Sequence, residues 1–172
     1  MSWGDPAPTA MKFIDIHRCP WQHAVGEDGP KPDPEAGPNK LLTLEQWHAV
    51  RSHWPADVKV ALEMGNDADV LALAPDLDRI ALVVLDFPKW TDGRAYSQAH
   101  LLRTRLKFTG AIRARGEVLV DMVQMLARTG FDEAQLRGDQ SLAIAERQLA
   151  FFNDGFYQGD VGETRPWFQR RA

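Results

Sequence analysis

Two kinds of hydrophobic pattern alternate along the second half of the chain. Nearly continuous apolar runs such as RIALVVLDF are typical of strands buried on both faces. Apolar residues that recur every three or four positions are typical of amphipathic helices. The patterns predict strands at residues 57–64, 79–87, 110–115 and 131–136, and helices at 66–78, 95–107, 117–129 and 140–152.

The resulting order is four consecutive βα units, and it predicts the fold class. Alternating units of this length form right-handed crossovers, so we expect an α/β fold with a mainly parallel sheet. A flavodoxin-like layer and a half-barrel both satisfy this order. The pattern does not choose between them.

The chain before residue 57 is less regular. Residues 13–16 indicate a short strand, and Thr43 with Gln46 has the spacing of a capping box that opens a helix. Between these elements, residues 26–39 contain four prolines and three glycines. This composition predicts a long loop with neither helix nor ladder.

These boundaries predict one domain flanked by two ends. The strand and helix patterns define a single α/β domain at residues 11–157. Residues 1–10 are expected to be a disordered extension, and residues 158–172 a C-terminal tail. Within the domain, Gly130 follows a helix at the position where a left-handed residue is favoured.

Composition narrows the class of protein. A hydrophobic content of 44% suffices for a core, and a net charge of −4 gives no general attraction to nucleic acid or anionic membranes. No apolar run approaches the roughly 20 residues that span a bilayer. The N-terminus lacks the features of a signal peptide, and the single cysteine excludes an internal disulfide. We expect a cytoplasmic protein that binds neither nucleic acid nor membrane. These features are compatible with a homo-oligomer.

Polar residues gather where the predicted strands end. The carboxyl ends of parallel strands meet at one edge of a sheet, and sites in α/β folds collect there. We call this predicted edge the rim; it comprises residues 63–67, 86–94, 113–116 and 137–139.

Three arginines of the rim predict an anion site. Arg113 and Arg115 are two apart on a strand, so their side chains project to the same side. Arg94 follows Gly93 and Arg115 precedes Gly116, each just before a predicted helix start, where free N–H groups favour anions. The planar guanidinium matches sulfate, phosphate or carboxylate. Arg94, Arg113 and Arg115 are therefore the predicted anion-binding residues, with Gly93 and Gly116 shaping the turns.

Acidic residues nearby have two interpretations. Asp86 and Asp92 could orient the arginines toward a ligand. Alternatively, ion pairs with Asp86, Asp92, Glu117 and Asp121 merely fix the loops. If the protein is an enzyme, four side chains are candidate acids or bases over a bound anion: Asp92, Tyr96, Asp121 and Asp132.

Other chemistry is less marked. His17, Cys19 and His23 could supply three zinc ligands, or Cys19 could be a nucleophile activated by one of the histidines, but no fourth ligand is indicated. There is no glycine-rich dinucleotide motif after a strand and no Walker lysine. We predict no nicotinamide, flavin or nucleotide cofactor.

Three blocks in order resemble the bacterial family called Domain of Unknown Function 934. They are LDFPKWTDGRAYSQAHLLR (85–103), TGAIRARGEVLVDM (109–122) and ARTGFDEAQL (127–136), and the resemblance extends over roughly residues 40–157. The positions that match the family's motifs are Phe87, Pro88, Asp92, Gly93, Arg94, Tyr96, Ser97, Arg103, Arg113, Gly116, Asp121, Arg128, Gly130, Phe131 and Asp132.

The resemblance implies a role in sulfur assimilation. Members are typically encoded beside the assimilatory sulfite reductase and are often labelled as oxidoreductases. Many relatives carry a cysteine where Thr129 stands here, and a glutamine where Met122 stands, so a redox role for that cysteine cannot operate in this chain.

We therefore expect an accessory protein of sulfate or sulfite reduction that binds an oxyanion or an acidic partner surface. The alternatives are an oxidoreductase or other small-molecule enzyme of sulfur metabolism, and a non-catalytic interaction module for a sulfite reductase subunit. An interaction module predicts an exposed, partly apolar patch that includes Trp90.

Overall fold

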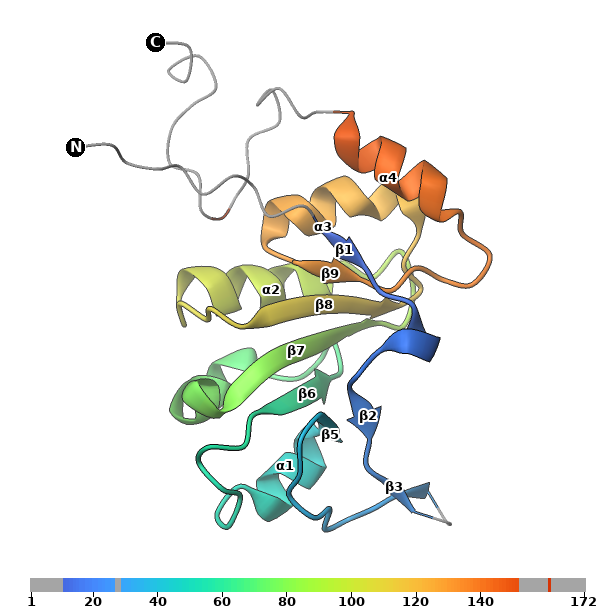
Figure 1. Cartoon of the computed structure of the whole chain (residues 1–172). Helices are drawn as coiled ribbons and strands as arrows, with labels where there is room; N and C mark the ends of the chain where they lie inside the picture. The colour runs from blue at the N-terminus through green and yellow to red at the C-terminus, as the bar shows by residue number, and fades with distance from the viewer. Residues whose placement is uncertain (1–10, 27–28, 152–160, 162–172) are drawn as a thin grey trace, which may run out of the picture.

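Seven strands form one parallel sheet (Figure 1). The computed structural model describes residues 11–26, 29–151 and 161. Within them the sheet order is β1-β9-β8-β7-β6-β5-β2. The sheet strands are β1 (Lys12–Phe13), β2 (Gln22–His23), β5 (Lys40–Thr43), β6 (Val60–Met64), β7 (Ile80–Phe87), β8 (Ala111–Gly116) and β9 (Glu133–Ala134). The helices are η1 (Ile16–Arg18), α1 (Leu44–Val50), η2 (Val70–Arg79), α2 (Arg94–Thr104), η3 (Val120–Met122), α3 (Val123–Thr129) and α4 (Leu142–Ala150).

The strand order settles the choice between the two predicted architectures. From β5 to β9, each strand of the sheet lies beside the strand of the sheet that precedes it along the chain. A flavodoxin-like layer would reverse direction at a switch point inside the sheet. The α/β prediction is therefore confirmed, and the sheet is a half-barrel.

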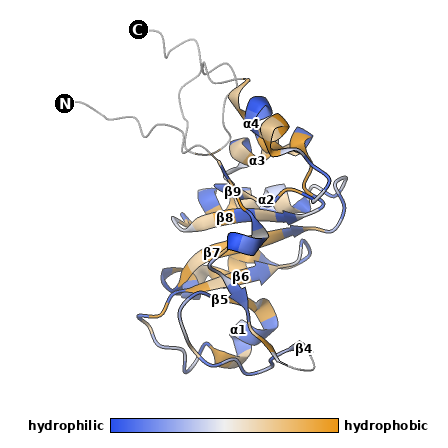
Figure 2. Cartoon of the chain, turned by 45° about the vertical axis from the view of Figure 1, so that its right-hand side comes forward, coloured by the Kyte–Doolittle hydropathy of each residue, from blue (hydrophilic) through white to orange (hydrophobic). Residues whose placement is uncertain are grey.

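The main core lies between the sheet and its helices. On β7, Val83, Leu85 and Phe87 are buried in this core, together with residues of α1, η2, α2 and α3. Strand side chains alternate between faces, so Leu82 and Val84 point to the other side, where they form a smaller apolar cluster. The central strands β6 and β7 appear largely hydrophobic in Figure 2, as expected for strands covered on both faces.

The capping box predicted at the start of the first helix is present. The backbone N–H of Gln46 donates to Thr43 Oγ1 at 3.2 Å, and the Thr43 N–H donates to Gln46 Oε1 at 2.9 Å. The Gln46 amide also donates to the carbonyl groups of Ala24 and Lys31. One side chain thus begins α1 and fixes the proline-rich segment beside it.

Several elements differ from the sequence prediction. The segment at 66–78 is a 3-10 helix over Val70–Arg79, since Pro75 lacks the N–H that an α-helix needs there. The four-residue strand β5 was not predicted, because so short a run carries little pattern. The expectation that residues 26–39 form no ladder was wrong: β3 (Val25–Gly26) pairs with β4 (Gly29–Pro30) in a minimal antiparallel ladder.

The predicted chain ends fall mainly outside the described residues. This holds for the whole extension at 1–10 and for the tail at 158–172 except Val161. Among the described helices, none combines the length and apolar character needed to cross a membrane.

Gly130 ends α3 in the left-handed conformation predicted for it. Its φ is 104°, and the following Phe131 N–H donates to the Leu126 carbonyl at 3.1 Å. A Cβ at this position would lie 2.6 Å from Cγ of Arg103. Arg103 in turn donates to the Gly130 carbonyl at 3.0 Å and pairs with Asp132. The glycine therefore allows both the turn and the close approach of Arg103.

We expect Gly130→Ala to lower the free energy of unfolding by about 1–3 kcal/mol, because it adds backbone strain and displaces Arg103. Urea denaturation would measure the loss. Gly138→Ala is the matched control, since nothing lies within 4 Å of the Cβ it would add. Equal stabilities for the two variants would contradict this account.

Candidate functional site

The inner face of the half-barrel, opposite the helices, presents side chains in layers. Strand register places Leu41, Ala61, Leu82 and Ala111 side by side in an apolar layer. The next layer toward the carboxyl ends is mixed and contains Thr43, Glu63, Val84, Arg113 and Glu133. One step further, Asp86 lies opposite Arg115. Charge on this face therefore increases toward the carboxyl ends of the strands.

An N-terminal segment, residues 14–23, crosses this inner face, and we call it the strap. β1 pairs with β9 at one edge of the sheet, whereas β2 pairs with β5 at the other. The chain must therefore pass over the sheet between them, as the blue segment in Figure 1 shows. Backbone hydrogen bonds hold its two ends: Ile14 N–H to the Ala134 carbonyl and Gln22 N–H to the Asn39 carbonyl, both 2.9 Å.

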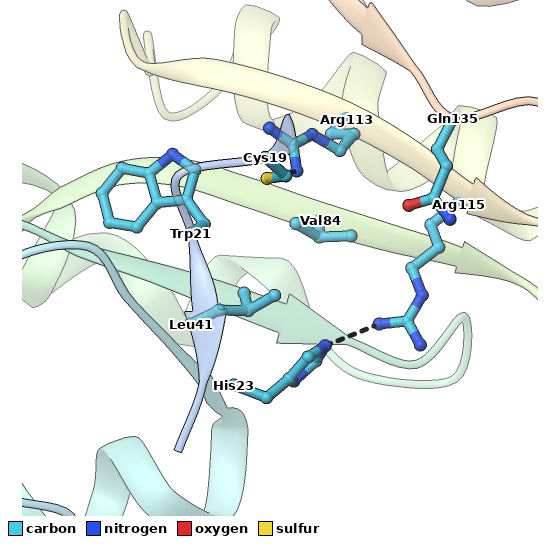
Figure 3. Close-up of a pocket in the computed structure, with 8 residues that line it drawn as sticks. All are labelled: Cys19, Trp21, His23, Leu41, Val84, Arg113, Arg115 and Gln135. Atoms are coloured by element: carbon cyan, nitrogen blue, oxygen red, sulfur yellow. Dashed lines mark hydrogen bonds between the residues drawn. The ribbon is translucent and has the colours of Figure 1, made fainter. Parts of the chain in front are cut away.

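A cavity of about 50 Å³ lies between the strap and the sheet (Figure 3). Its lining residues come from both: Cys19, Trp21, His23, Leu41, Val84, Arg113, Arg115 and Gln135. The floor is apolar and the polar wall consists of two guanidinium groups, an amide, an imidazole and a thiol. Among the described residues, no carboxylate lines this cavity.

Arg113 is buried on the inner face, with only 4% of its surface exposed. Its Nε and Nη2 lie 2.7 Å from the same carboxylate oxygen of Glu133. Its Nη1 donates to Sγ of Cys19 at 3.1 Å. A buried charge of this kind is tolerated because it is paired. Arg113 thus connects β8 to β9 and to the strap.

Arg115 lies nearer the carboxyl end of β8 and is more exposed. Its Nη1 lies 2.7 Å from Oε2 of Glu63 and 3.2 Å from Nε2 of His23. Arginine can only donate, so Nε2 of His23 accepts, and a neutral ring then carries its proton on Nδ1. That nitrogen faces Glu63 Oε2 at 3.5 Å. His23 is therefore the second contact between strap and arginine.

Asp86 occupies the carboxyl-end layer beside this cluster. Burial raises the pKa of its carboxyl group; the charge of Arg115 opposes this shift, and that of Glu63 adds to it. Within the described chain, no group donates a hydrogen bond to the Asp86 carboxylate. The role predicted for Asp86, orienting an arginine, is thus limited to an electrostatic interaction with Arg115 here.

The arginine predicted at the helix start lies elsewhere. Arg94 forms a two-pronged pair with Asp92, with Nε–Oδ1 at 3.0 Å and Nη2–Oδ2 at 2.7 Å. Hydrogen bonds from Arg94 hold the pKa of Asp92 at about 2. The Asp92 carboxylate also accepts the Arg94 backbone N–H, so it occupies the start of α2 that follows Gly93. Arg94 does not line the cavity that Arg113 and Arg115 share.

The candidate acids and bases are dispersed. Tyr96 packs edge-on against Phe87 and Phe131, and burial raises its pKa to about 12. Asp121 is exposed in η3. Asp132 binds Arg103 and the Ile112 N–H. With Asp92 at the start of α2, none of the four lines the inner cavity.

Asp132 instead borders an open depression of about 210 Å³. The depression lies where β1, β8 and β9 begin, and Lys12, Gly110 and Glu133 also line it. This is the amino-end side of the parallel strands, opposite the side on which sites of such folds collect.

The possible zinc ligands do not converge. Cys19 faces Arg113 and His23 faces Arg115, whereas His17 is exposed on η1. Within residues 11–26, 29–151 and 161, no group of three or more His, Cys, Asp or Glu side chains could hold a metal ion. Cys19 and His23 instead line the cavity on the inner face, and His17 does not.

Sequence reasoning did not select two side chains of this face. Glu133 and Gln135 alternate on the β9 strand pattern, and that spacing of two predicts a shared face with Arg113 and Arg115. The contribution of Trp21 had no such signal, since it depends on where the strap crosses the sheet.

The chain belongs to a family of bacterial proteins of unknown function, Domain of Unknown Function 934, whose model matches residues 61–168. The match includes β8, which carries Arg113 and Arg115, and Gln135 directly after β9. It starts after the strap, β5 and α1. No curated protein matches the sequence.

We expect Asp86→Asn to raise the melting temperature at pH 7. Because the folded state raises the pKa of Asp86, folding binds protons between the unfolded and folded pKa values, and stability falls as pH rises through that window. The asparagine removes this loss. Its advantage should shrink as the pH falls toward the ordinary carboxyl value of about 4.

Asp92→Asn should behave in the opposite way. The pKa of Asp92 is lowered, so its pair with Arg94 stabilises the fold above the unfolded pKa and is lost as pH falls toward about 2. The variant should melt below the wild type at pH 7 and approach it in acid. Thermal melts from pH 3 to pH 8 would compare the two, and shifts of the same sign would refute the assignment.

Proposed function

We propose that the protein binds a small oxyanion in the inner cavity and acts as an accessory protein of sulfate or sulfite reduction. The observation that carries the proposal is the composition of the cavity wall. Two guanidinium groups and an amide face it, whereas the carboxylates of Glu63 and Glu133 that balance them lie outside the lining.

Unused donors on Arg115 support anion binding. A guanidinium has five N–H groups. Arg115 makes its hydrogen bond to His23 and its ion pair with Glu63 through Nη1, and its Nε and Nη2 have no hydrogen-bond acceptor among the described residues. These two nitrogens form the fork that matches two oxygens of an oxyanion. The amide of Gln135, which also lines the cavity, has no side-chain partner in the described chain.

The volume of the cavity favours a ligand of a few atoms. A water molecule occupies about 30 Å³ in the liquid, and pockets for drug-sized ligands measure roughly 300–1,000 Å³. A cavity of about 50 Å³ is therefore on the scale of a sulfite or phosphate ion. The apolar floor of Leu41 and Val84 reduces competition from water for the arginine donors.

The sulfur-assimilation context comes from the family resemblance. Relatives are typically encoded beside assimilatory sulfite reductase, which makes a sulfur oxyanion the natural choice among small anions. Among the described residues, the acids or bases at the cavity are those already in contact with Arg113 or Arg115. We therefore propose binding in preference to catalysis.

A second candidate function is an interaction module for a reductase subunit. Trp90 is 59% exposed in the turn between β7 and α2, beside the exposed pair of Arg94 and Asp92. Tryptophan and arginine are enriched among residues that dominate protein interfaces. Loss of co-purification with sulfite reductase in Trp90→Ala would support this alternative.

Calorimetric titration with sulfite, phosphate and sulfate would test the oxyanion proposal. We expect at least one of them to bind, and Arg115→Gln to weaken binding by about tenfold to a hundredfold, since charged hydrogen bonds contribute about 1.5–3 kcal/mol. Arg113→Met combined with Glu133→Gln removes the second guanidinium without leaving a buried charge. It should also weaken binding.

Two further variants locate the site. Arg147→Gln removes an equal charge from exposed α4 and should leave binding unchanged. Arg94→Ala distinguishes anion binding in the cavity from anion binding at the start of α2. A large loss of binding in this variant would place the anion at the helix instead. Absence of binding by all three anions, or normal binding by Arg115→Gln, would overturn the proposal.

A further inference from the structure

Asp86 is the single acidic residue of β7, and the cavity contacts described above do not use it. Leu82, Val84 and Asp86 alternate with residues of the main core and so face the inner side. Val84 forms part of the cavity floor. Asp86 therefore lies one layer further toward the carboxyl end of the sheet, on the same face as the cavity.

An unused acceptor, the Asp86 carboxylate, and unused donors of Arg115 lie in the same layer of the sheet. Strand register places Asp86 opposite Arg115. Arg115 directs Nη1 to Glu63 and His23 and not to Asp86. Among the described residues, the Asp86 carboxylate then accepts no hydrogen bond, and Nε and Nη2 of Arg115 donate none. Glu63 and His23 are already in contact with Arg115, whereas Asp86 is the carboxylate at this level without a hydrogen-bond partner among the described residues.

Gly116 leaves room beside the carboxylate. Its φ is 96°, and an added Cβ would lie 2.9 Å from Oδ1 of Asp86 and 2.5 Å from the Phe87 carbonyl oxygen. A side chain at residue 116 would therefore displace Asp86. The glycine keeps the carboxyl group in place beside the strand end.

A ligand that satisfies both unused groups must be a donor as well as an acceptor. The Arg115 fork needs oxygen lone pairs, whereas an ionised carboxylate needs an O–H group. Near neutral pH a substantial fraction of sulfite and of phosphate carries a proton, but sulfate carries none. Sulfate would set a bare oxygen against the carboxylate, and such an unpaired repulsive contact discriminates strongly between otherwise similar ligands.

We propose that Asp86 makes this site selective for oxyanions that retain a proton, such as sulfite and phosphate, and against sulfate. This inference rests on the proposed function, since it concerns the same anion and the same Arg115 fork. It assigns Asp86 a role in specificity that differs from orienting an arginine. It also implies that the ligand of this protein is a reduced or protonated anion and not the fully oxidised sulfate.

The test compares wild type and Asp86→Asn by calorimetry at pH 7 with sodium sulfite, phosphate and sulfate as separate probes. We expect the wild type to bind sulfite or phosphate at least about tenfold more tightly than sulfate. The asparagine can donate to a bare oxygen, so the variant should bind sulfate more tightly and the other two more weakly. Asp57→Asn, an exposed aspartate in the turn before the amino end of β6, is the charge-matched control and should keep the wild-type preference.

The outcomes separate the two proposals. If the wild type binds none of the three anions, the proposed function fails. If it binds sulfate as tightly as sulfite and phosphate, or if Asp86→Asn keeps the wild-type preference, the selectivity inference fails while anion binding stands. Glycine serves as a further probe, because its carboxylate and ammonium groups could also bridge Arg115 and Asp86. Tighter binding of glycine than of the oxyanions would likewise overturn the inference. Thermal melts establish that each variant is folded.

Discussion

An open parallel half-barrel has one face that its own helices cannot cover. Helices that connect consecutive parallel strands all lie on the outer face, and here they bury Val83, Leu85 and Phe87. The inner face would expose Leu82 and Val84 to water if nothing crossed it. The strap meets this requirement by running from the β9 edge to the β5 edge. The position of the strap in turn makes the cavity.

Covering this face also removes its charges from water, and that explains their pairing. Arg113 is almost completely buried, and an unpaired guanidinium there would be strongly destabilising. Glu133 balances it through Nε and Nη2, and Glu63 balances Arg115. Pairing is complete at Arg113 but incomplete one layer further on, at Arg115 and Asp86. The difference between the layers leaves the unused hydrogen-bonding groups nearest the carboxyl end of the sheet.

Local features were predictable from the sequence because their causes are local. The capping box at Thr43, the left-handed Gly130 and the shared face of Arg113 and Arg115 follow from spacings of one to three residues. The contact of Cys19 with Arg113 joins residues separated by 94 positions, and no periodicity encodes it. The strand order, and with it the choice of a half-barrel, likewise depends on packing between units that look alike in sequence.

The separation of Arg94 from the cavity has the same physical origin. The strand ends do share one rim, as the sequence predicts, but Arg94 belongs to the helix α2 that follows β7 and does not line the cavity. Asp92 is two residues away and captures Arg94 locally, whereas Arg113 and Arg115 are carried inward by the strand itself. The family model begins at residue 61, so it includes this inward-facing arginine pair but not the strap that closes over it. The arginine wall of the cavity and its cover therefore belong to different parts of the chain. A change in the strap could alter access to the cavity while leaving the arginine wall intact.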